Sequence, residues 1–254
     1  MTHARTLALL VTSCGLMSGC FGDSGSAVIA PTNESPGGIW TGTDSQTGLP
    51  VTGLVTESGQ FHFVRKDGTQ YVGTVTTSGM SGSGSFDGFA PPGTTFADGS
   101  IHGIGTVSGT VHQRSAFTAT TQFTTDAGSP SSDTLSMTYN TLYDRPSSLA
   151  TVAGTFTEQG TGTVFSIDAN GMIFAQAGSC VISGAVTIID ATYNAYRVSV
   201  SYANCAGQYP TLNGVTLTGL GSLDNSVSPE RAVLGLSGTA GTTKLAIWDV
   251  LDRS

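Results

Sequence analysis

Short runs in which apolar and polar residues alternate fill most of the chain beyond about residue 37. The clearest run is YRVSVSY at residues 196–202, where every second side chain is apolar or aromatic. A period of two places the apolar side chains on one face of a strand and the polar side chains on the other. After the first twenty residues, no stretch has a helical period longer than two turns. The pattern therefore predicts an all-β protein.

Turn residues divide the second half of the chain into about eight such runs. We expect strands near residues 149–158, 164–169, 171–177, 180–190, 195–205, 211–223, 231–237 and 243–252. The connections are short and hairpin-like, which favours an antiparallel meander. Eight strands with apolar inner faces close naturally into a small up-and-down barrel. A two-sheet β-sandwich is the alternative.

The chain also repeats itself. GIWT at 38–41 matches GTFT at 154–157, LVTESGQFHF at 54–63 matches SIDANGMIF at 166–174, and VGTVT at 72–76 matches SGAVT at 183–187. LSMTYNTLYDR, which ends at Arg145, matches LAIWDVLDR, which ends at Arg253. Since the four matches follow the same order, they indicate two copies of one module. We place module 1 at residues 38–147 and module 2 at residues 148–254.

The N-terminus differs from the rest of the chain. Arg5 precedes an apolar run from Leu7 to Met17, which is long enough for a secretory signal and too short to span a bilayer. Met17-Ser18-Gly19-Cys20 resembles the lipobox of bacterial lipoproteins, a resemblance that implies acylation of Cys20 and anchoring by acyl chains. Residues 1–19 would then be the signal peptide and residues 20–37, rich in Ser, Gly and Pro, a flexible tether.

Two alternatives to this lipobox remain. Val11-Thr12-Ser13-Cys14 also fits the pattern, but it would leave an h-region that is too short. An ordinary secretory signal is the other. Phe21 follows Cys20 where an Asp would favour the inner membrane, so we expect a lipid-anchored protein of the outer membrane, facing either the periplasm or the outside.

Composition and charge narrow the class of partner. Charged residues make up 10% of the chain, the formal net charge is −8, and there are 35 glycines. Without a basic patch, nucleic acid is not expected as a partner. The one paired basic spot, VRKDG at 64–68, is interpreted as a solvated turn. Asp44, Asp67 and Asp98 also occupy predicted turns, where Asp makes local hydrogen bonds.

Two cysteines are expected to form a disulfide. With Cys20 acylated, Cys180 and Cys205 remain as an even pair in an oxidising compartment. CVISGAVTIID and AYRVSVSYANC read as the two strands of a hairpin, which would place Cys180 opposite Cys205. Opposed residues are among the few positions close enough to bridge.

Module 1 contains a segment with the composition of a loop, GMSGSGSFDGFAPPGTTFADGS at residues 79–100. We expect a wide loop that presents Phe86, Phe89 and Phe96 as a binding edge, because loops carry recognition. The alternative is that these rings plug the end of the barrel.

The chain carries no recognisable catalytic motif. GDSGS at 22–26 resembles the nucleophile segment of chymotrypsin-like proteases, but it lies in the tether and its only upstream histidine is in the signal. His62, His102 and His112 have no metal-binding spacing, and His62 is expected on the wet face of its strand, opposite Phe61 and Phe63. We therefore predict no enzyme activity, no metal and no cofactor. The Asp-Arg pairs that end both modules, at 144–145 and 252–253, are expected to tie the last strand to the barrel rim. The alternative is a paired recognition site.

The junction YDRPSSLATVAGTFT, together with SCVISG and the terminal strand pattern, resembles uncharacterised proteobacterial lipoproteins with tandem β modules. That resemblance implies location and architecture and supplies no catalytic residues. The leading functional hypothesis is a binding or envelope-interaction module that meets a protein, a glycan or a small ligand. The alternatives are a structural component of envelope assembly, a periplasmic enzyme inhibitor and, least favoured, an envelope hydrolase.

Overall fold

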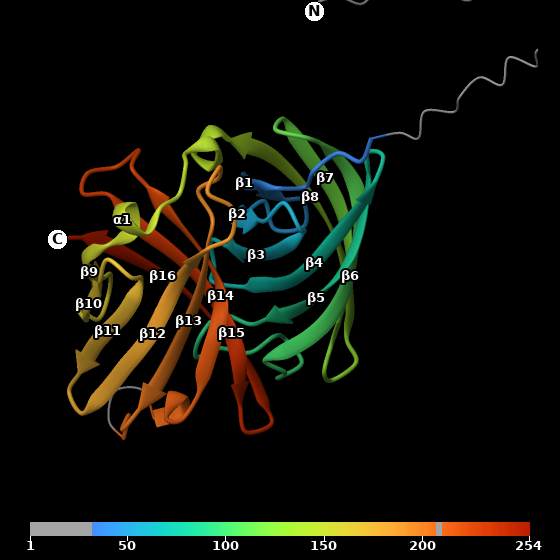
Figure 1. Cartoon of the computed structure of the whole chain (residues 1–254). Helices are drawn as coiled ribbons and strands as arrows, with labels where there is room; N and C mark the ends of the chain where they lie inside the picture. Colours follow the sequence, from blue (N-terminus) through green and yellow to red (C-terminus); the bar gives the residue numbers. More distant parts are fainter. Residues whose placement is uncertain (1–31, 207–209) are drawn as a thin grey trace, which may run out of the picture. The chain divides into compact units, whose positions relative to one another are not determined.

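The computed structural model describes residues 32–206 and 210–254, which fold into two closed barrels of eight antiparallel strands each (Figure 1). Both the predicted all-β class and the predicted tandem barrels are confirmed. Cys20 and most of the tether lie outside the described residues. In the part of the chain that the structure describes, no helix has the length and apolar character needed to cross a membrane.

Barrel 1 is a meander in which every strand pairs with the next one along the chain. Pairing of the last strand with the first, from Ile39 with Asn140 to Asp44 with Leu135, closes it. Its strands are β1 (Gly38–Asp44), β2 (Pro50–Val55), β3 (Gln60–Arg65), β4 (Gln70–Ser78), β5 (Ser81–Phe89), β6 (His102–His112), β7 (Ala116–Thr125) and β8 (Pro130–Asn140).

Barrel 2 repeats this topology and closes where the last strand pairs with the first, as at Arg253 with Phe156. Its strands are β9 (Gly154–Glu158), β10 (Val164–Ile167), β11 (Met172–Ala177), β12 (Cys180–Ile188), β13 (Tyr196–Ala203), β14 (Thr216–Asp224), β15 (Arg231–Ala240) and β16 (Thr243–Arg253). A 3₁₀ turn, η1 (Thr141–Asp144), and one helical turn, α1 (Leu149–Val152), connect the barrels, and a second 3₁₀ turn, η2 (Pro210–Leu212), precedes β14.

The four repeated sequence segments occupy equivalent strands of the two barrels, namely the first, second and third, fourth, and last. Gly59 and Gly171 are equivalent in detail as well. Both have positive φ, 84° and 80°, and their carbonyls accept from the backbone N–H of Val75 and Val186 at 2.9 and 2.7 Å. A β-carbon at either position would collide with the carbonyl of that same valine, so both turns require glycine.

Each barrel has its own apolar interior. Trp40, Phe61 and Phe117 lie in the core of barrel 1, and Phe156, Ile182 and Leu217 lie in the core of barrel 2. In β11 and β13 the interior positions alternate with solvent-facing or half-buried residues along the strand. The barrel interior is therefore filled by apolar side chains, as the alternating pattern predicted.

Two local predictions were wrong. Residues 81–89, expected in a loop, form β5, in which Gly84 and Gly88 lie where a side chain would not fit. A β-carbon on Gly84 would lie 1.9 Å from the Thr74 carbonyl oxygen, and one on Gly88 would lie 2.5 Å from the Phe123 ring. Residues 149–152, expected at the start of a strand, form α1, capped by the side chain of Ser148, which accepts from the N–H of Thr151.

A third cluster of buried side chains joins the barrels, with Ile39 and Leu54 from barrel 1 and Leu220 from barrel 2. Asn194 holds the connecting segment beside them. Its side-chain amide donates to the carbonyls of Leu142 and Leu223 at 3.1 and 2.6 Å, and its Oδ1 accepts from the N–H of Leu223 at 2.9 Å. Its side chain thus ties barrel 2 to the segment that connects the two barrels.

Candidate functional site

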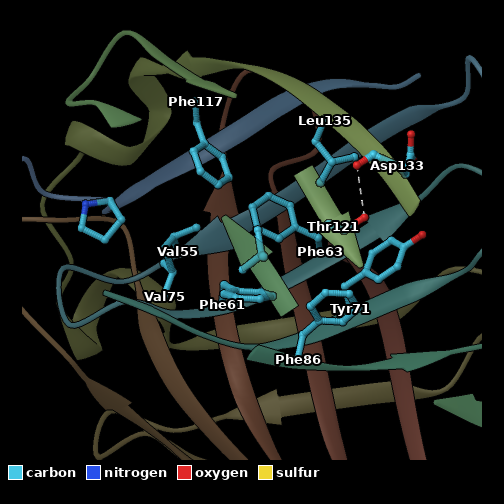
Figure 2. A pocket seen from close by; sticks show the side chains of 12 residues that line it. Val55, Phe61, Phe63, Tyr71, Val75, Phe86, Phe117, Thr121, Asp133 and Leu135 are labelled. Carbon is cyan, nitrogen blue, oxygen red and sulfur yellow. Dashed lines mark hydrogen bonds between the residues drawn. The ribbon is translucent and has the colours of Figure 1, made fainter. Parts of the chain in front are cut away.

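The interior of barrel 1 contains a small cavity of about 30 Å³. Aromatic and aliphatic side chains from several strands point into it, as Figure 2 shows. The residues lining it include Val55, Phe61, Phe63, Tyr71, Val75, Phe86, Phe117 and Leu135. A volume of this size holds one or two water molecules, so the barrel is filled by its own side chains.

Glycines on the neighbouring strands make room for the rings. A β-carbon on Gly53 would lie 2.2 Å from the ring of Phe63, and one on Gly105 would lie 2.3 Å from the ring of Phe86. Phe86 in turn stacks on Phe123 with the ring centroids 6.0 Å apart and contacts Tyr71 edge-on at 5.6 Å. These strands are rich in glycine because the aromatic rings occupy the space that side chains at the glycine positions would need.

A second cavity, of about 440 Å³, lies at the mouth of barrel 1 and shares Tyr71, Thr121 and Asp133 with the interior cavity. Its lining also includes Arg65 of β3, Phe96 and other residues of the β5–β6 connection, and residues of β7. Burial raises the pKa of Tyr71 to about 12, so the phenol is neutral. The mouth therefore combines aromatic rings with ionisable groups.

Arg65 is the central cation of the mouth. Its guanidinium donates to Asp44 Oδ2 at 2.7 Å, to both oxygens of Asp67 at 2.8–3.1 Å, and to Thr69 Oγ1 at 3.1 Å. Burial alone would raise the pKa of Asp44, but hydrogen bonds from the Thr47 backbone and from Arg65 lower it to about 2. VRKDG forms a turn with Lys66 and Asp67 exposed, as predicted, but Arg65 at its start closes a partly buried ion-pair network.

The connection between β5 and β6 covers part of this mouth. The ring of Phe96 packs edge-on against Phe123, with 5.4 Å between centroids. Asp98 accepts from the backbone N–H of Ser100 at 3.0 Å, from its hydroxyl at 2.6 Å, and from the hydroxyl of Thr125. These hydrogen bonds, led by that from the Ser100 hydroxyl, hold the pKa of Asp98 well below its usual range. The connection thus presents a ring and a permanent carboxylate to the mouth.

Arg65 and two carboxylates, Asp98 and Asp133, line the mouth, and two further carboxylates, Asp44 and Asp67, bind Arg65. Asp44 and Asp67 neutralise Arg65, and Asp133 accepts from the Ser45 hydroxyl at 2.8 Å and the Gln46 N–H at 3.0 Å. The site therefore carries an excess of three negative charges. Such a site attracts cations and repels anions.

Of the three phenylalanines predicted on the binding loop, only Phe96 lies on a connection. Phe86 and Phe89 belong to β5, and both are buried. Phe86 lines the barrel interior, and Phe89 lies edge-on to His102 with centroids 5.2 Å apart. The structure brings Phe86 and Phe96 together through Phe123, which both rings contact.

The three histidines have different surroundings. His62 lies on the outer face of β3 as predicted, but it is not wet: it is 1% exposed, because barrel 2 covers it. His102 lies between Asp87 and Asp126, with ring nitrogens 2.8 and 3.0 Å from their carboxylates, and Lys244 of barrel 2 reaches Asp87 at 2.7 Å. Within the described ranges, no group of three His, Cys, Asp or Glu side chains is arranged to hold a metal ion.

The predicted disulfide between Cys180 and Cys205 is present, with a Cα–Cα distance of 4.0 Å. The two cysteines are not directly opposed, however. Val181 pairs with Ala203, so a straight strand would place Asn204 opposite Cys180. Asn204 has a positive φ of 59°, and this bend at the end of β13 brings Cys205 to the bridging position.

At the module ends Asp144 and Asp252 pair with Arg114 and Arg231. In module 2, Arg253 ties the end of the last strand to the segment before the first strand, as expected. Arg145 and Arg253 both bind Glu230, one to each carboxylate oxygen. Arg253 also donates to the carbonyls of Ala153 and Thr151, at 2.8 and 2.6 Å. The two module ends are thus held together through one carboxylate of barrel 2.

Sequence reasoning did not single out Arg65, Tyr71 or Asp133 as a group, and it placed Asp98 and Asp44 only in turns. These five residues come from separate strands and connections, and closure of the barrel brings them together. The sequence signal was weak: Arg65 is one of only nine Lys and Arg residues in the chain.

Comparison with known proteins gives little. No family model matches the chain, and no curated protein sequence matches it. Among solved structures, immune modulator A of Aeromonas veronii is similar over 89% of this chain and 97% of its own, at 11% identity and a TM-score of 0.36. A likeness at this level supports no statement about function.

Proposed function

We propose that this protein is a lipid-anchored binding protein of the bacterial envelope, and that the mouth of barrel 1 binds a small organic cation with an apolar body. The observation that carries the proposal is the mouth itself: a cavity of about 440 Å³ that combines excess carboxylates with the rings of Tyr71, Phe96 and Phe123. A volume of roughly 300–1,000 Å³ is typical of small-molecule sites.

The charge of the mouth selects the class of ligand. Asp44 and Asp67 are occupied by Arg65, but the half-buried carboxylate of Asp98 and the carboxylate of Asp133 have no cationic partner among the described residues. A ligand ammonium group would supply one. Aromatic faces next to that position add a favourable interaction between the cation and the π system, worth about 0.5–2 kcal/mol.

The size of the inner cavity limits how the ligand can bind. With about 30 Å³ inside the barrel, a ligand cannot be enclosed as in a hollow carrier. It would rest at the mouth, with its apolar body against Phe96 and Phe123 and its charged group toward Asp98. The β5–β6 connection, held by the bond between Asp98 and Thr125, would form one wall.

The binding experiment uses the full chain, purified in an uncharged polyoxyethylene detergent. Calorimetric titrations would compare phenethylamine, which is a cation, with 2-phenylethanol, its neutral analogue. We expect the amine to bind at least tenfold more tightly and Asp98→Asn to weaken amine binding at least threefold. Asp168→Asn is the matched control, because Asp168 is also an exposed turn carboxylate with a lowered pKa, but on barrel 2. Equal affinity for the two probes would contradict the proposal.

The anchor rests on the sequence, since Cys20 lies outside the described residues. In cells fed an alkyne analogue of palmitate, we expect the protein to be labelled and to fractionate with the outer membrane. Cys20→Ser should abolish the label, whereas Cys14→Ser, which alters only the competing motif, should leave it. Labelling that survives Cys20→Ser would remove the proposed anchor and leave the binding site untouched.

A further inference from the structure

The outer faces of three strands from each barrel enclose a third cavity, the inter-barrel cavity, of about 290 Å³. β1, β2 and β3 supply one side, and β14, β15 and β16 supply the other. It shares no lining residue with the mouth of barrel 1, so the two are separate sites. Small-molecule sites form preferentially where two domains meet.

Two side chains of opposite charge stand at the rim of the inter-barrel cavity. Asp224 on β14 and Arg231 on β15 are directly paired across the two strands, and both line the cavity. Directly opposed side chains have Cβ atoms about 5 Å apart. Even so, no ion pair joins these two described residues. Instead, Nε of Arg231 binds Asp252 at 2.8 Å, and Oδ1 of Asp224 accepts from the N–H of Ser226 at 2.9 Å.

Both charged groups keep atoms with which a ligand could pair. Nε is the one nitrogen of Arg231 that another described residue binds, so its two terminal nitrogens remain available. Asp224 uses only Oδ1, to which Ser226 donates both its N–H and its hydroxyl. The side chain of Arg231 is 38% exposed and Asp224 is half-buried, so a molecule at the rim can reach both. A carboxylate and an ammonium group on neighbouring atoms of one ligand would satisfy the two together.

Inward from this rim, the wall that barrel 2 supplies is mainly apolar. The next positions on the same face of β15 and β16 are Val233 and Val250, and the positions after them are Gly235 and Trp248. Because a strand rises about 3.3 Å per residue, the Trp248 end of the cavity lies roughly 13 Å from the charged rim. The cavity therefore has room for an apolar group below the charges.

Barrel 1 supplies the opposite wall, to which Ile39 and Leu54 contribute apolar side chains. His62 belongs to this wall only as a surface. Its Nε2 lies 2.9 Å from the amide oxygen of Gln70, and the backbone of Gly235 covers its Nδ1. The partners for a charged ligand group are thus confined to the rim.

We propose that the inter-barrel cavity binds an α-amino acid with a large apolar side chain. Its carboxylate would accept hydrogen bonds from the terminal nitrogens of Arg231, and its ammonium group would donate to Asp224. Its side chain would lie along Val233 and Val250 and point toward Trp248. The inference stands on its own, because it uses no residue of the proposed amine site.

Other classes of small molecule fit the cavity less well. A carboxylate without an ammonium group would meet Arg231 but would also face the like charges of Asp224 and Asp252. An amine without a carboxylate would leave the terminal nitrogens of Arg231 unpaired. An amino acid with a short side chain, such as alanine, would leave Val233 and Val250 uncovered and gain little from burial.

The test uses the full chain in a polyoxyethylene detergent. Calorimetric titrations would compare L-leucine and L-phenylalanine with L-alanine and with 3-phenylpropionate, which is phenylalanine without its ammonium group. We expect saturable binding of at least one of the first two, at least tenfold tighter than that of either comparison compound.

The chain has two tryptophans, which allows the ligand to be located by fluorescence. Trp40 is buried in the core of barrel 1, whereas Trp248 lines the cavity. In Trp40→Phe, Trp248 is the one remaining tryptophan, and L-leucine should change its emission with the same saturation curve as the calorimetry.

Asp224→Asn is the decisive variant, because its side-chain oxygen can still accept from Ser226 while the charge is lost. We expect it to weaken amino-acid binding at least tenfold. Asp190→Asn is the matched control: Asp190 makes the same turn bond, to the N–H of Thr192, and is exposed on barrel 2 outside the cavity. It should leave the affinity unchanged. Arg231→Lys, which keeps the charge and loses paired donors, should weaken binding at least threefold and serves if the Asp224 variant does not fold.

The proposal is overturned if neither L-leucine nor L-phenylalanine binds the folded protein saturably, or if 3-phenylpropionate binds as tightly as L-phenylalanine. It is also overturned if Asp224→Asn binds as tightly as the native chain, or if Asp98→Asn, at the mouth of barrel 1, abolishes amino-acid binding. Loss of phenethylamine binding with amino-acid binding intact would count only against the proposed function.

Discussion

The imidazole of His62 in barrel 1 packs directly against the backbone of Gly235 in barrel 2. A β-carbon at position 235 would lie 2.5 Å from Cγ and 2.7 Å from Nδ1 of His62. Atoms do not approach so closely, so the histidine can occupy this place only because residue 235 is glycine. The contact therefore couples the sequence of one barrel to that of the other.

This relationship predicts the effect of Gly235→Ala. The added methyl must push the His62 ring away, which disturbs its bond to Gln70, and we expect a loss of about 1–3 kcal/mol in the free energy of unfolding. Urea denaturation would measure it. Gly82→Ala is the control, because a β-carbon there meets its nearest neighbour at an ordinary 3.4 Å. In the double variant with His62→Ala, Gly235→Ala should cost little, and a full cost there would contradict the explanation.

The alternation of residues predicted which face of β3 carries His62, but not what lies over that face. A period of two assigns side chains to the inside or the outside of a barrel. It does not say whether the outside meets water or a second domain. Each module has the sequence pattern of a complete barrel, so that pattern does not indicate that a second barrel covers part of its outer face. The inter-barrel cavity was therefore beyond prediction from the sequence.

Arg65 and Asp44 form a mostly buried ion pair, with side chains 16% and 0% exposed. Asp44→Ala would leave the guanidinium without its most buried partner, and we expect a loss of about 3 kcal/mol in unfolding free energy. The other carboxylate on Arg65, Asp67, is 34% exposed, so Asp67→Ala should cost less than about 1 kcal/mol. Denaturation at pH 7 would compare them. Similar losses for the two variants would show that burial does not determine how much each ion pair contributes to the free energy of unfolding.

The ion pair also shows why the mouth of barrel 1 escaped prediction. Asp44 ends β1 and Arg65 ends β3, 21 residues apart, and each stands next to a connection in which the sequence shows only turn residues. Turn residues are chosen for local hydrogen bonds, as Asp44 shows by accepting from Thr47, and the same side chain can then serve a distant partner. The repeats predicted the order of the strands. The contacts between residues at the strand ends depend on closure of the barrel, so the sequence did not predict them.

The disulfide between Cys180 and Cys205 closes a loop of 25 residues. On the chain-entropy account, its removal lowers the free energy of unfolding by roughly 3–4 kcal/mol. We expect the double variant Cys180→Ser/Cys205→Ser to show this loss in urea denaturation at equilibrium. Dithiothreitol should lower the stability of the native chain toward that of the variant and leave the variant unchanged. A variant as stable as the native chain would mean that strand pairing alone holds this hairpin.

Asp249 is a carboxyl group that faces the interior of barrel 2. Ile247 and Leu251 on the same strand pack against the core, and alternation along β16 places Asp249 on that face as well. Burial raises the pKa of Asp249 to about 7, and the negative charge of Glu158 adds to the effect. In the unfolded chain the group titrates near its ordinary value of 3.8.

The sign of the pH dependence follows from these two values. Between about pH 4 and pH 7 the folded chain holds a proton on Asp249 that the unfolded chain has lost, so stability falls as the pH rises through this window and is constant above it. Asp249→Asn removes the effect. We expect the variant to match the native chain at pH 4 and to exceed its unfolding free energy by about 2 kcal/mol at pH 8, a figure reduced for partial solvent access.

Asp252, three residues further along β16, provides the opposite control. Its hydrogen bonds from Arg231 and Gln159 lower its pKa, so Asp252→Asn should remove a stabilising contribution that is present above about pH 4. Denaturation curves of both variants at pH 4 and pH 8 should therefore diverge from the native chain in opposite directions as the pH rises. If Asp249→Asn gave the same difference at both pH values, the group would be ionised inside the barrel, and its burial would have to be compensated by water or by a cation.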